Sequence, residues 1–167
     1  MNHNEQKIIL AIDPGYDRCG AAIITTGVTT QVEHSWCIIT SKKDSHADRL
    51  VVVFKNIEAA IKEYRPDIIA LETLFFSVNK KTALAVAEAR GVIVVLAGLH
   101  GMPLIELSPQ EVKVAMTGTG NADKIGVQKM VAMTLKIDIS KKLDDEIDAI
   151  ALGMAAAGTL RLQQFTK

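Results

Sequence analysis

The chain has 167 residues, of which 49% are hydrophobic, so it is long enough for one well-packed core and short for two ordinary domains. Its 19 basic and 19 acidic residues cancel, so it lacks the overall positive charge that is typical of nucleic-acid-binding proteins. The longest apolar run, Gly91 to Leu99, is too short to span a membrane, and no secretory signal precedes the first strand. We therefore expect residues 1–167 to form a single cytoplasmic domain without membrane association.

Three β-type runs open the chain, Lys7 to Asp13, Arg18 to Thr26 and Gln31 to Thr40. Because no helical pattern separates them, we expect these strands to pair antiparallel. A helix is predicted next over Asp48 to Tyr64.

Strand and helix patterns alternate in the rest of the chain. Strand patterns cover Asp67 to Glu72 and Pro103 to Leu107, and helical patterns cover Lys81 to His100, Asn121 to Lys136, Asp144 to Gln163 and a segment opened by the capping residues Ser108-Pro109-Gln110-Glu111. The order predicts an α/β fold, a mixed five-stranded sheet with three antiparallel strands and then two parallel-type strands, flanked by helices. The segment Lys81 to His100 is apolar on nearly every face, which favours contact with a partner subunit.

Cys19 and Cys37 lie on two of the paired strands. A chain with two cysteines, no CxxC motif and no secretory signal offers neither a disulfide framework nor a zinc site. We expect small buried hydrophobic side chains, and the pattern leaves open whether the two touch.

Two predicted strands are wholly apolar and end in an acid, since Ile8 to Ile12 runs into Asp13 and Ile68 to Leu71 runs into Glu72. Unbroken apolar runs are typical of central, parallel-type strands, whose carboxyl ends carry the sites of open α/β sheets. If the two strands are neighbours, the carboxylates lie about 5 Å apart. Each acid taken alone could equally cap the turn that follows its strand.

A further acidic cluster, Asp144-Asp145-Glu146-Ile147-Asp148, opens the last helix. Asp145 and Asp148 share a helical face, although acids are common in a first turn because the helix dipole favours them. Two carboxylates 5 Å apart repel by roughly 3 kcal/mol at an effective dielectric near 20, so four together would need cations. Oxygen-only ligands favour two Mg²⁺ or Mn²⁺ ions, an arrangement that hydrolyses phosphodiesters.

The chain resembles the RuvC-type Holliday junction resolvases of the ribonuclease H-like superfamily along nearly its whole length. The matching motifs are, in order, Ile12-Asp13-Pro14-Gly15, Glu72 with Phe75, Ala89-Arg90-Gly91, Val112-Lys113, Gly118-Thr119-Gly120 leading to Lys124, and Asp145 with Asp148. The acids are common to the superfamily. Their combination with Phe75 and with Gly118 to Lys124 is what resembles a resolvase.

The resemblance implies a Mg²⁺-dependent homodimeric endodeoxyribonuclease that cuts two opposed strands of a four-way (Holliday) DNA junction in recombination and repair. It implies that Asp13, Glu72, Asp145 and Asp148 are catalytic and hold two Mg²⁺ ions, for which Mn²⁺ would substitute. The choice of Asp145 over Asp144 rests on the resemblance alone. Docking of a junction-binding branch-migration helicase complex stays open.

Six further residues are expected to contact DNA, namely Phe75, Lys80, Lys81, Arg90, Lys113 and Lys124. Phe75 would stack on unpaired bases at the junction centre, although it could equally close the core. Lys124 follows a glycine-rich turn at a helix start, a favourable place for an anion. A solvated lysine is the alternative there. Asp17 stands where relatives usually carry a small or basic residue, and it could pair with Arg18, alter metal affinity or face away.

Three rival interpretations are weighed against this one. Another ribonuclease H-like nuclease, acting on RNA or on RNA/DNA hybrid, would share the four acids. An actin-like ATPase or sugar kinase also ends its first strand in Asp-x-Gly, but its duplicated second domain does not fit this length. A non-catalytic junction-binding module would keep the acids without using them.

Overall fold

The computed structural model describes residues 6–73 and 80–165, without the side chains of residues 80–82, 164 and 165. Within this part of the chain the strands are β1 (Ile8–Asp13), β2 (Arg18–Thr25), β3 (Gln31–Ile39), β4 (Ile68–Glu72) and β5 (Leu104–Leu107). The helices are α1 (His46–Tyr64), α2 (Lys80–Leu99), α3 (Pro109–Thr117), α4 (Lys124–Leu135) and α5 (Asp144–Phe165). The elements follow one another in the predicted order.

The strands of the described residues form one mixed sheet in the order β3-β2-β1-β4-β5. β1 pairs antiparallel with β2, and β2 pairs antiparallel with β3. β4 runs parallel to both β1 and β5. The predicted combination of three antiparallel strands and two parallel ones is confirmed, and the wholly apolar strands β1 and β4 are neighbours inside the sheet.

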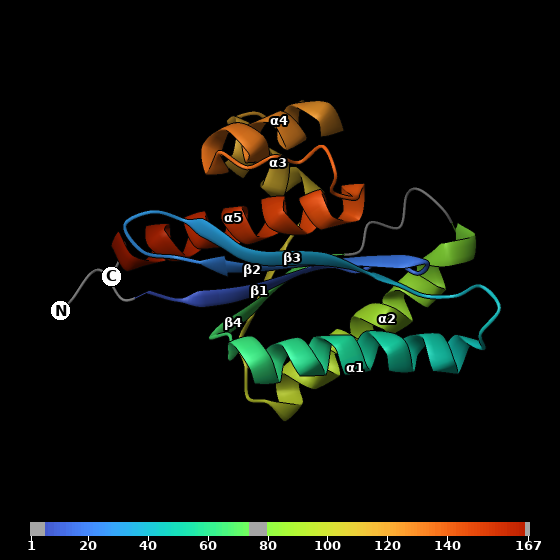
Figure 1. Cartoon of the computed structure of the whole chain (residues 1–167). Helices are drawn as coiled ribbons and strands as arrows, with labels where there is room; N and C mark the ends of the chain where they lie inside the picture. Colours follow the sequence, from blue (N-terminus) through green and yellow to red (C-terminus); the bar gives the residue numbers. More distant parts are fainter. Residues whose placement is uncertain (1–5, 74–79, 166–167) are drawn as a thin grey trace.

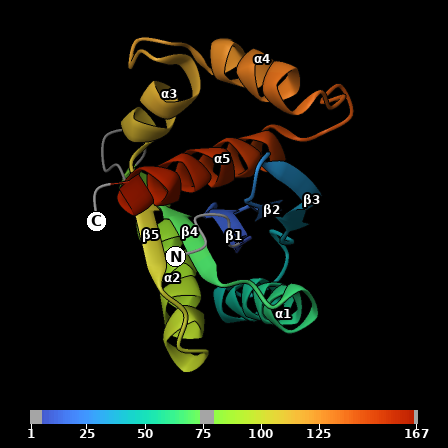
Figure 2. The ribbon, with the colours of Figure 1, turned by 90° about the vertical axis from the view of Figure 1, so that its left-hand side faces the viewer.

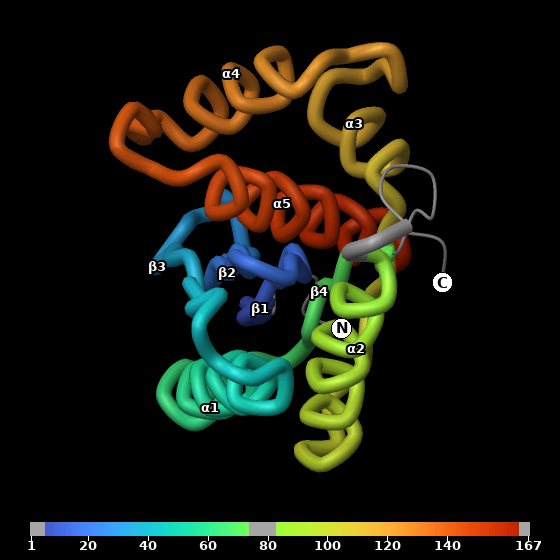
Figure 3. Tube along the Cα trace, turned by 90° about the vertical axis from the view of Figure 1, so that its right-hand side faces the viewer, coloured from blue at the N-terminus to red at the C-terminus, as the bar shows by residue number. Residues whose placement is uncertain are grey.

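Helices cover both faces of the sheet (Figure 1). α1 and α2 cover one face, whereas α5 crosses the other, with α3 and α4 arching over α5 (Figures 2 and 3). Alternate residues of β1 divide between the two cores, because Leu10 and Ile12 pack with the α1 and α2 side while Ile9 and Ala11 pack with α5. The period of two thus lets one apolar strand join both hydrophobic layers.

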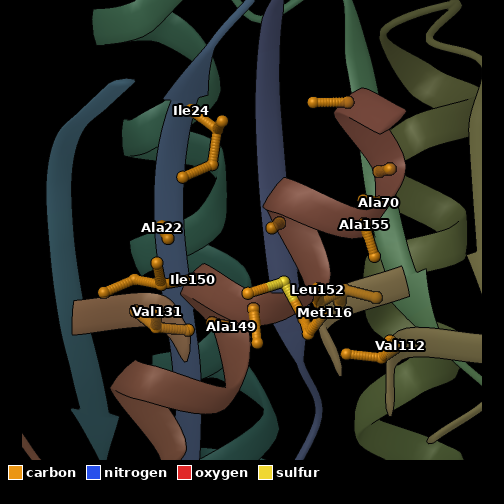
Figure 4. Close-up of a cluster of buried hydrophobic side chains, with 14 of the residues drawn as sticks. Ala22, Ile24, Ala70, Val112, Met116, Val131, Ala149, Ile150, Leu152 and Ala155 are labelled. Atoms are coloured by element: carbon orange, nitrogen blue, oxygen red, sulfur yellow. The ribbon is translucent and has the colours of Figure 1, made fainter. Parts of the chain in front are cut away.

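Small residues bring α5 close to the sheet. Ala149, Ile150 and Ala155 lie in the cluster that joins α5 to β1 and β2 (Figure 4). A Cβ added to Gly153 would lie 2.4 Å from Ile24 Cγ1 and 3.0 Å from the Cβ of Ala11. The backbone of α5 therefore rests almost directly on β1 and β2, so that the first turn of this helix can reach the strand ends.

Capping residues explain where three helices begin. Ser108 and Glu111 form the predicted capping box of α3, with proline near its start. α1 begins earlier than predicted because the Ser45 side chain accepts a hydrogen bond from the backbone of Asp48. α4 begins later than predicted, at Lys124, because Asp123 is its N-cap.

Both cysteines are free thiols. Cys19 is paired with Ile38 across β2 and β3, and Cys37 is paired with Gly20, so the two cysteine side chains point to opposite faces of the sheet. Burial raises the pKa of the Cys19 thiol to about 12, which keeps it protonated. Cys19 is the buried hydrophobic side chain that was predicted, whereas Cys37 is only half-buried.

Part of the apolar surface of α2 is exposed. Leu84, Val95 and Leu99 have exposed fractions of 69%, 57% and 70%, and a separation of 11 residues places Leu84 and Val95 on the same side of the helix. No helix in the described part of the chain is both long enough and apolar enough to cross a membrane.

Two glycines of α5 provide a matched test of this close packing. Gly153→Ala should destabilise the protein by about 1–2 kcal/mol, because the clash with Ile24 outweighs the gain in helix propensity. Gly158→Ala should stabilise it by about 0.5–1 kcal/mol, because an added Cβ meets no atom within 4 Å. Urea unfolding measures both, and equal effects of the two substitutions would contradict the packing described here.

Candidate active site

Two acids meet at the carboxyl ends of the central strands. Asp13 is the last residue of β1 and Glu72 the last of β4, and the parallel register pairs Ile12 with Leu71 directly before them. Their side chains are joined by a hydrogen bond. The two strands are therefore neighbours, as the pattern of the sequence predicted, and their acids face one another rather than capping separate turns.

A glycine on β2 allows the first turn of α5 to bring Asp145 and Asp148 close to Asp13. Gly20 is paired with Asp13 across β1 and β2. A Cβ added to Gly20 would lie 1.8 Å from the carbonyl oxygen of Asp145, so any other residue there would push the first turn of α5 off the sheet. The negative charges of Asp145 and Asp148 both act on Asp13 as a result.

Asp144 is more exposed than the other two aspartates of this turn. Its side chain is 61% exposed, compared with 25% for Asp145 and 34% for Asp148. The amide of Gln128 donates a hydrogen bond of 3.1 Å to Asp144. Asp145 and Asp148 are thus more enclosed than Asp144, a difference that the spacing of acids in the sequence did not indicate.

Crowding raises the pKa of three of the four acids. Burial, the hydrogen bond with Glu72 and the charges of Glu72, Asp148 and Asp145 hold the pKa of Asp13 well above its ordinary value. Burial also raises the pKa of Glu72, and the charge of Asp148 adds to this. The pKa of Asp148 is raised by burial in spite of the hydrogen bond from Lys124. Without added cations, the cluster therefore favours a proton between Asp13 and Glu72.

Two cations of the chain compensate the acids of α5. Arg18 Nε lies 2.9 Å from Asp145 Oδ2. Lys124 Nζ lies 2.9 Å from Asp148 Oδ2 and 3.5 Å from Asp144 Oδ2. Burial alone would lower the pKa of Lys124, but its hydrogen bond to Asp148 and the two negative charges raise it. Lys124 thus stays charged against the cluster.

The donor set suits a hard divalent cation. All four side chains offer carboxylate oxygens, and Asp145 Oδ2 is buried without a hydrogen-bond partner, because Arg18 Nε is close but not aligned to donate. In the described residues no three Asp, Glu, His or Cys side chains converge as a ready-made ligand set. The acids are instead occupied by each other and by Arg18 and Lys124, so a bound cation would replace these partners.

A hollow of about 280 Å³ opens beside the acids. Asp13, Glu72 and Asp148 line it together with Lys113 of α3 and Lys124 of α4. Its remaining wall is apolar and comes from Pro109, Val112, Val127, Ala151 and Leu152. Carboxylates and lysines in one hollow can bind a cation and a phosphate group side by side.

The other predicted DNA contacts are less closely gathered. Arg90 of α2 forms an ion pair with Glu106 of β5, and its side chain is 23% exposed. Phe75 lies outside the described residues. Lys80 and Lys81 belong to the first turn of α2, and their side chains also lie outside the described residues.

Asp17 faces away from the acids, which answers the question left by the sequence. Arg49 Nη2 lies 2.7 Å from Asp17 Oδ1, and Lys42 Nζ lies 3.0 Å from Asp17 Oδ2. These two hydrogen bonds lower the pKa of Asp17. Asp17 is therefore paired with Arg49 and Lys42, and Arg18 is left for Asp145.

Arg49 holds the loop that follows Asp13. Its buried guanidinium donates hydrogen bonds to the carbonyl of Tyr16 (2.8 Å) and to Thr40 Oγ1 (2.9 Å), and it lies 3.6 Å from the centre of the Tyr16 ring. Sequence reasoning missed this residue, since an arginine within a helix pattern gives no sign that it is buried.

The raised pKa of Asp13 predicts how stability depends on pH without metal. Unfolded Asp13 loses its proton near 3.8 and folded Asp13 loses it at higher pH, so the native state binds more protons and the free energy of unfolding falls as pH rises above 3.8. Asp13→Asn should flatten this fall and raise the Tm at pH 7.5 in EDTA. The exposed acid Asp44 offers the control Asp44→Asn. A lower Tm for Asp13→Asn than for the wild type would contradict the electrostatic account.

Comparison with known proteins supports a specific family. The family model described as crossover junction endodeoxyribonuclease RuvC matches residues 9–156, which include all four acids. The crossover junction endodeoxyribonuclease RuvC of Brachyspira hyodysenteriae is 40% identical over 156 residues, covering 93% of this chain and 96% of the relative. The protein of the same name from Alkaliphilus metalliredigens is 37% identical over 161 residues, covering 96% and 98%.

The fold agrees with the sequence match. Thermus thermophilus RuvC, solved in complex with a Holliday junction substrate, has a TM-score of 0.87 to this chain at 26% identity, covering 95% of this chain and 97% of that one. The yeast mitochondrial Holliday junction resolvase Ydc2 shares the fold with a TM-score of 0.67 at 14% identity. This chain therefore belongs to the RuvC family of crossover junction endodeoxyribonucleases.

Proposed function

We propose that this chain is a Mg²⁺-dependent endodeoxyribonuclease that resolves four-way DNA junctions in recombination and repair. The observation that carries the proposal is the meeting of Asp13 and Glu72 with the acids of α5 beside the hollow that Lys113 and Lys124 share. The family membership adds the substrate class, because RuvC of Thermus thermophilus was solved with a Holliday junction substrate. The proposal places the chain in the cytoplasm, with chromosomal DNA.

Asp13, Glu72, Asp145 and Asp148 would hold two Mg²⁺ ions, and Mn²⁺ would substitute. Bound Mg²⁺ supplies the positive charge that activates water and stabilises the leaving oxygen of a phosphodiester. To bind the ions, Asp13 and Glu72 would lose the proton that they share. Asp145 and Asp148 would release their contacts with Arg18 and Lys124. The raised pKa values of Asp13 and Glu72 mean that the loss of this proton becomes easier as pH rises.

The two lysines of the hollow would bind the scissile strand. Lys124 is the first residue of α4, where backbone N–H groups and the helix dipole add to its charge. The apolar wall of the hollow, which includes Val112 and Leu152, would limit the access of bulk water to the bound phosphate. Further contacts are proposed for Arg90, Lys80 and Lys81, with Phe75 stacking on unpaired bases.

A homodimer would place two such sites on the two opposed strands of one junction. The exposed face of α2 supports this, because Leu84, Val95 and Leu99 place three exposed large apolar side chains on one helix. Gly91 and Gly98 lie on the same helix with open space where a Cβ would be, so a partner helix could approach closely. The same dimer would also bind a branch-migration helicase complex at the junction.

An alternative is a ribonuclease H-like nuclease that cuts RNA or RNA/DNA hybrid, since such enzymes share the acids. The family match and the relatives named crossover junction endodeoxyribonuclease favour DNA junctions instead. Cleavage of a hybrid duplex is therefore expected to be much weaker than cleavage of a junction.

Cleavage of labelled substrates tests the proposal directly. A mobile four-way junction should be nicked in the presence of Mg²⁺, whereas linear duplex and RNA/DNA hybrid should stay intact. Asp13→Asn and Glu72→Gln should each lower the rate at least about 100-fold, because each removes a ligand from the reacting centre, while junction binding in Ca²⁺ is retained. Lys42→Gln, which changes an exposed cation outside the hollow, should cleave normally. Full activity of Asp13→Asn would refute the assignment.

The exposed face of α2 gives a separate test of dimerisation. Leu99→Glu places a charge on this face, and it should shift the protein from dimer to monomer in light scattering at about 10 µM, since a desolvated charge opposes association. Met133→Glu is the control, because Met133 of α4 is 71% exposed and Leu99 is 70% exposed. A wild-type monomer, or the same shift for both variants, would count against this interface.

A further inference from the structure

The two cations that contact the α5 acids are placed differently. Lys124 lines the hollow, where the proposed function places the phosphate. Arg18 is the first residue of β2 and is absent from the lining of the hollow. Its contact is with Asp145, the acid of the four whose oxygen is buried without a hydrogen-bond partner. Arg18 therefore lies outside the hollow in which the phosphate is proposed to bind.

The backbone of Asp145 has little freedom to move. The backbone of Asp145 rests on Gly20, where even a methyl group would lie 1.8 Å from its carbonyl oxygen. Ser35 and Lys142 hold the next residue, Glu146, through hydrogen bonds of 2.6 Å each, and so fix the same turn to β3. The start of α5 is thus anchored before any metal arrives.

Arg18, in contrast, is weakly held. Its side chain is 46% exposed, and its Nε approaches Asp145 Oδ2 to 2.9 Å without the alignment that a hydrogen bond needs. The contact supplies positive charge but leaves the oxygen lone pairs unused. A divalent cation could therefore take the place of the guanidinium without breaking a well-formed hydrogen bond.

We propose that Arg18 is a resident counter-ion of the metal-free site, a positioning residue that holds Asp145 and competes with the divalent cation for this carboxylate. The inference rests on the proposed metal site and adds a residue to it. Arg18 stabilises the protein without metal, because Asp145 would otherwise repel Asp13 and Asp148 uncompensated. It also weakens metal binding, because the cation must displace it.

This role separates Arg18 from a structural ion pair. A structural pair persists when metal binds, so its loss would lower stability equally with and without metal. A counter-ion matters only until the metal replaces it. Its loss should therefore lower the Tm in EDTA more than the Tm in saturating Mn²⁺, and metal should bind more tightly.

The experiment uses the full chain without DNA and compares wild type, Arg18→Gln, Arg18→Lys and Lys42→Gln. Lys42 is the matched control, since it is an exposed cation paired with Asp17, outside the acid cluster. Mn²⁺ binding is measured by electron paramagnetic resonance of the free ion, and the Tm by calorimetry in EDTA and in saturating Mn²⁺. Arg18→Gln should lower the Kd for Mn²⁺ roughly three- to fivefold, the range expected for a partly exposed pair.

Arg18→Gln should also lower the Tm in EDTA and gain more from Mn²⁺ than the wild type does. Arg18→Lys keeps the charge and should stay near the wild-type Kd, and Lys42→Gln should change neither quantity. An unchanged or higher Kd in Arg18→Gln, or an equal loss of Tm in both conditions, would overturn the role of Arg18 alone. If the wild type binds Mn²⁺ no better than Asp13→Asn does, the metal site itself is wrong and both proposals fall.

Discussion

The site depends on one constraint, which is the mutual repulsion of four partly buried carboxylates. Asp13, Glu72, Asp145 and Asp148 come from three separate elements, and burial raises the pKa of three of them. A hydrogen bond joins two of these acids, and each of the other two forms an ion pair, so the repulsion is partly compensated within the chain. In the proposed function a divalent cation would replace these contacts.

The fold brings the acids together through close backbone contacts. The parallel register of β1 and β4 sets two acids side by side at one edge of the sheet. Gly20 and Gly153 then let α5 lie against β1 and β2, so that the first turn of α5 reaches this edge. The acids are therefore placed by main chain and core packing, whereas Arg18 and Lys124 reach them through partly exposed side chains.

The sequence predicted those parts of the structure that depend on local pattern. Two apolar runs that end in Asp13 and Glu72 indicated neighbouring central strands, and Ser108 with Glu111 indicated a helix start. Both predictions succeeded because hydrophobic periodicity and helix capping depend on residues that are close in the sequence. The mixed sheet followed from the order of these elements. The family resemblance supplied Asp145 in place of Asp144, which the helical spacing alone could not.

The features that were not predicted depend on contacts between distant segments. The pairing of Asp17 with Arg49, and of Arg18 with Asp145, joins residues that lie far apart in the sequence, so local spacing does not identify the partners. The need for glycine at position 20 appears only once α5 is seen to rest there. From the sequence, Asp17 could pair with the adjacent Arg18, alter metal affinity or face away, and only the fold shows that each of the two residues has a distant partner.

Anomalous diffraction from crystals grown with Mn²⁺ tests the central claim most directly. The account predicts anomalous peaks contacted by carboxylate oxygens of Asp13, Glu72, Asp145 and Asp148, with the Arg18 side chain no longer on Asp145. Peaks only on exposed surface acids such as Asp44, with Arg18 still against Asp145 and the hydrogen bond between Asp13 and Glu72 intact, would contradict it.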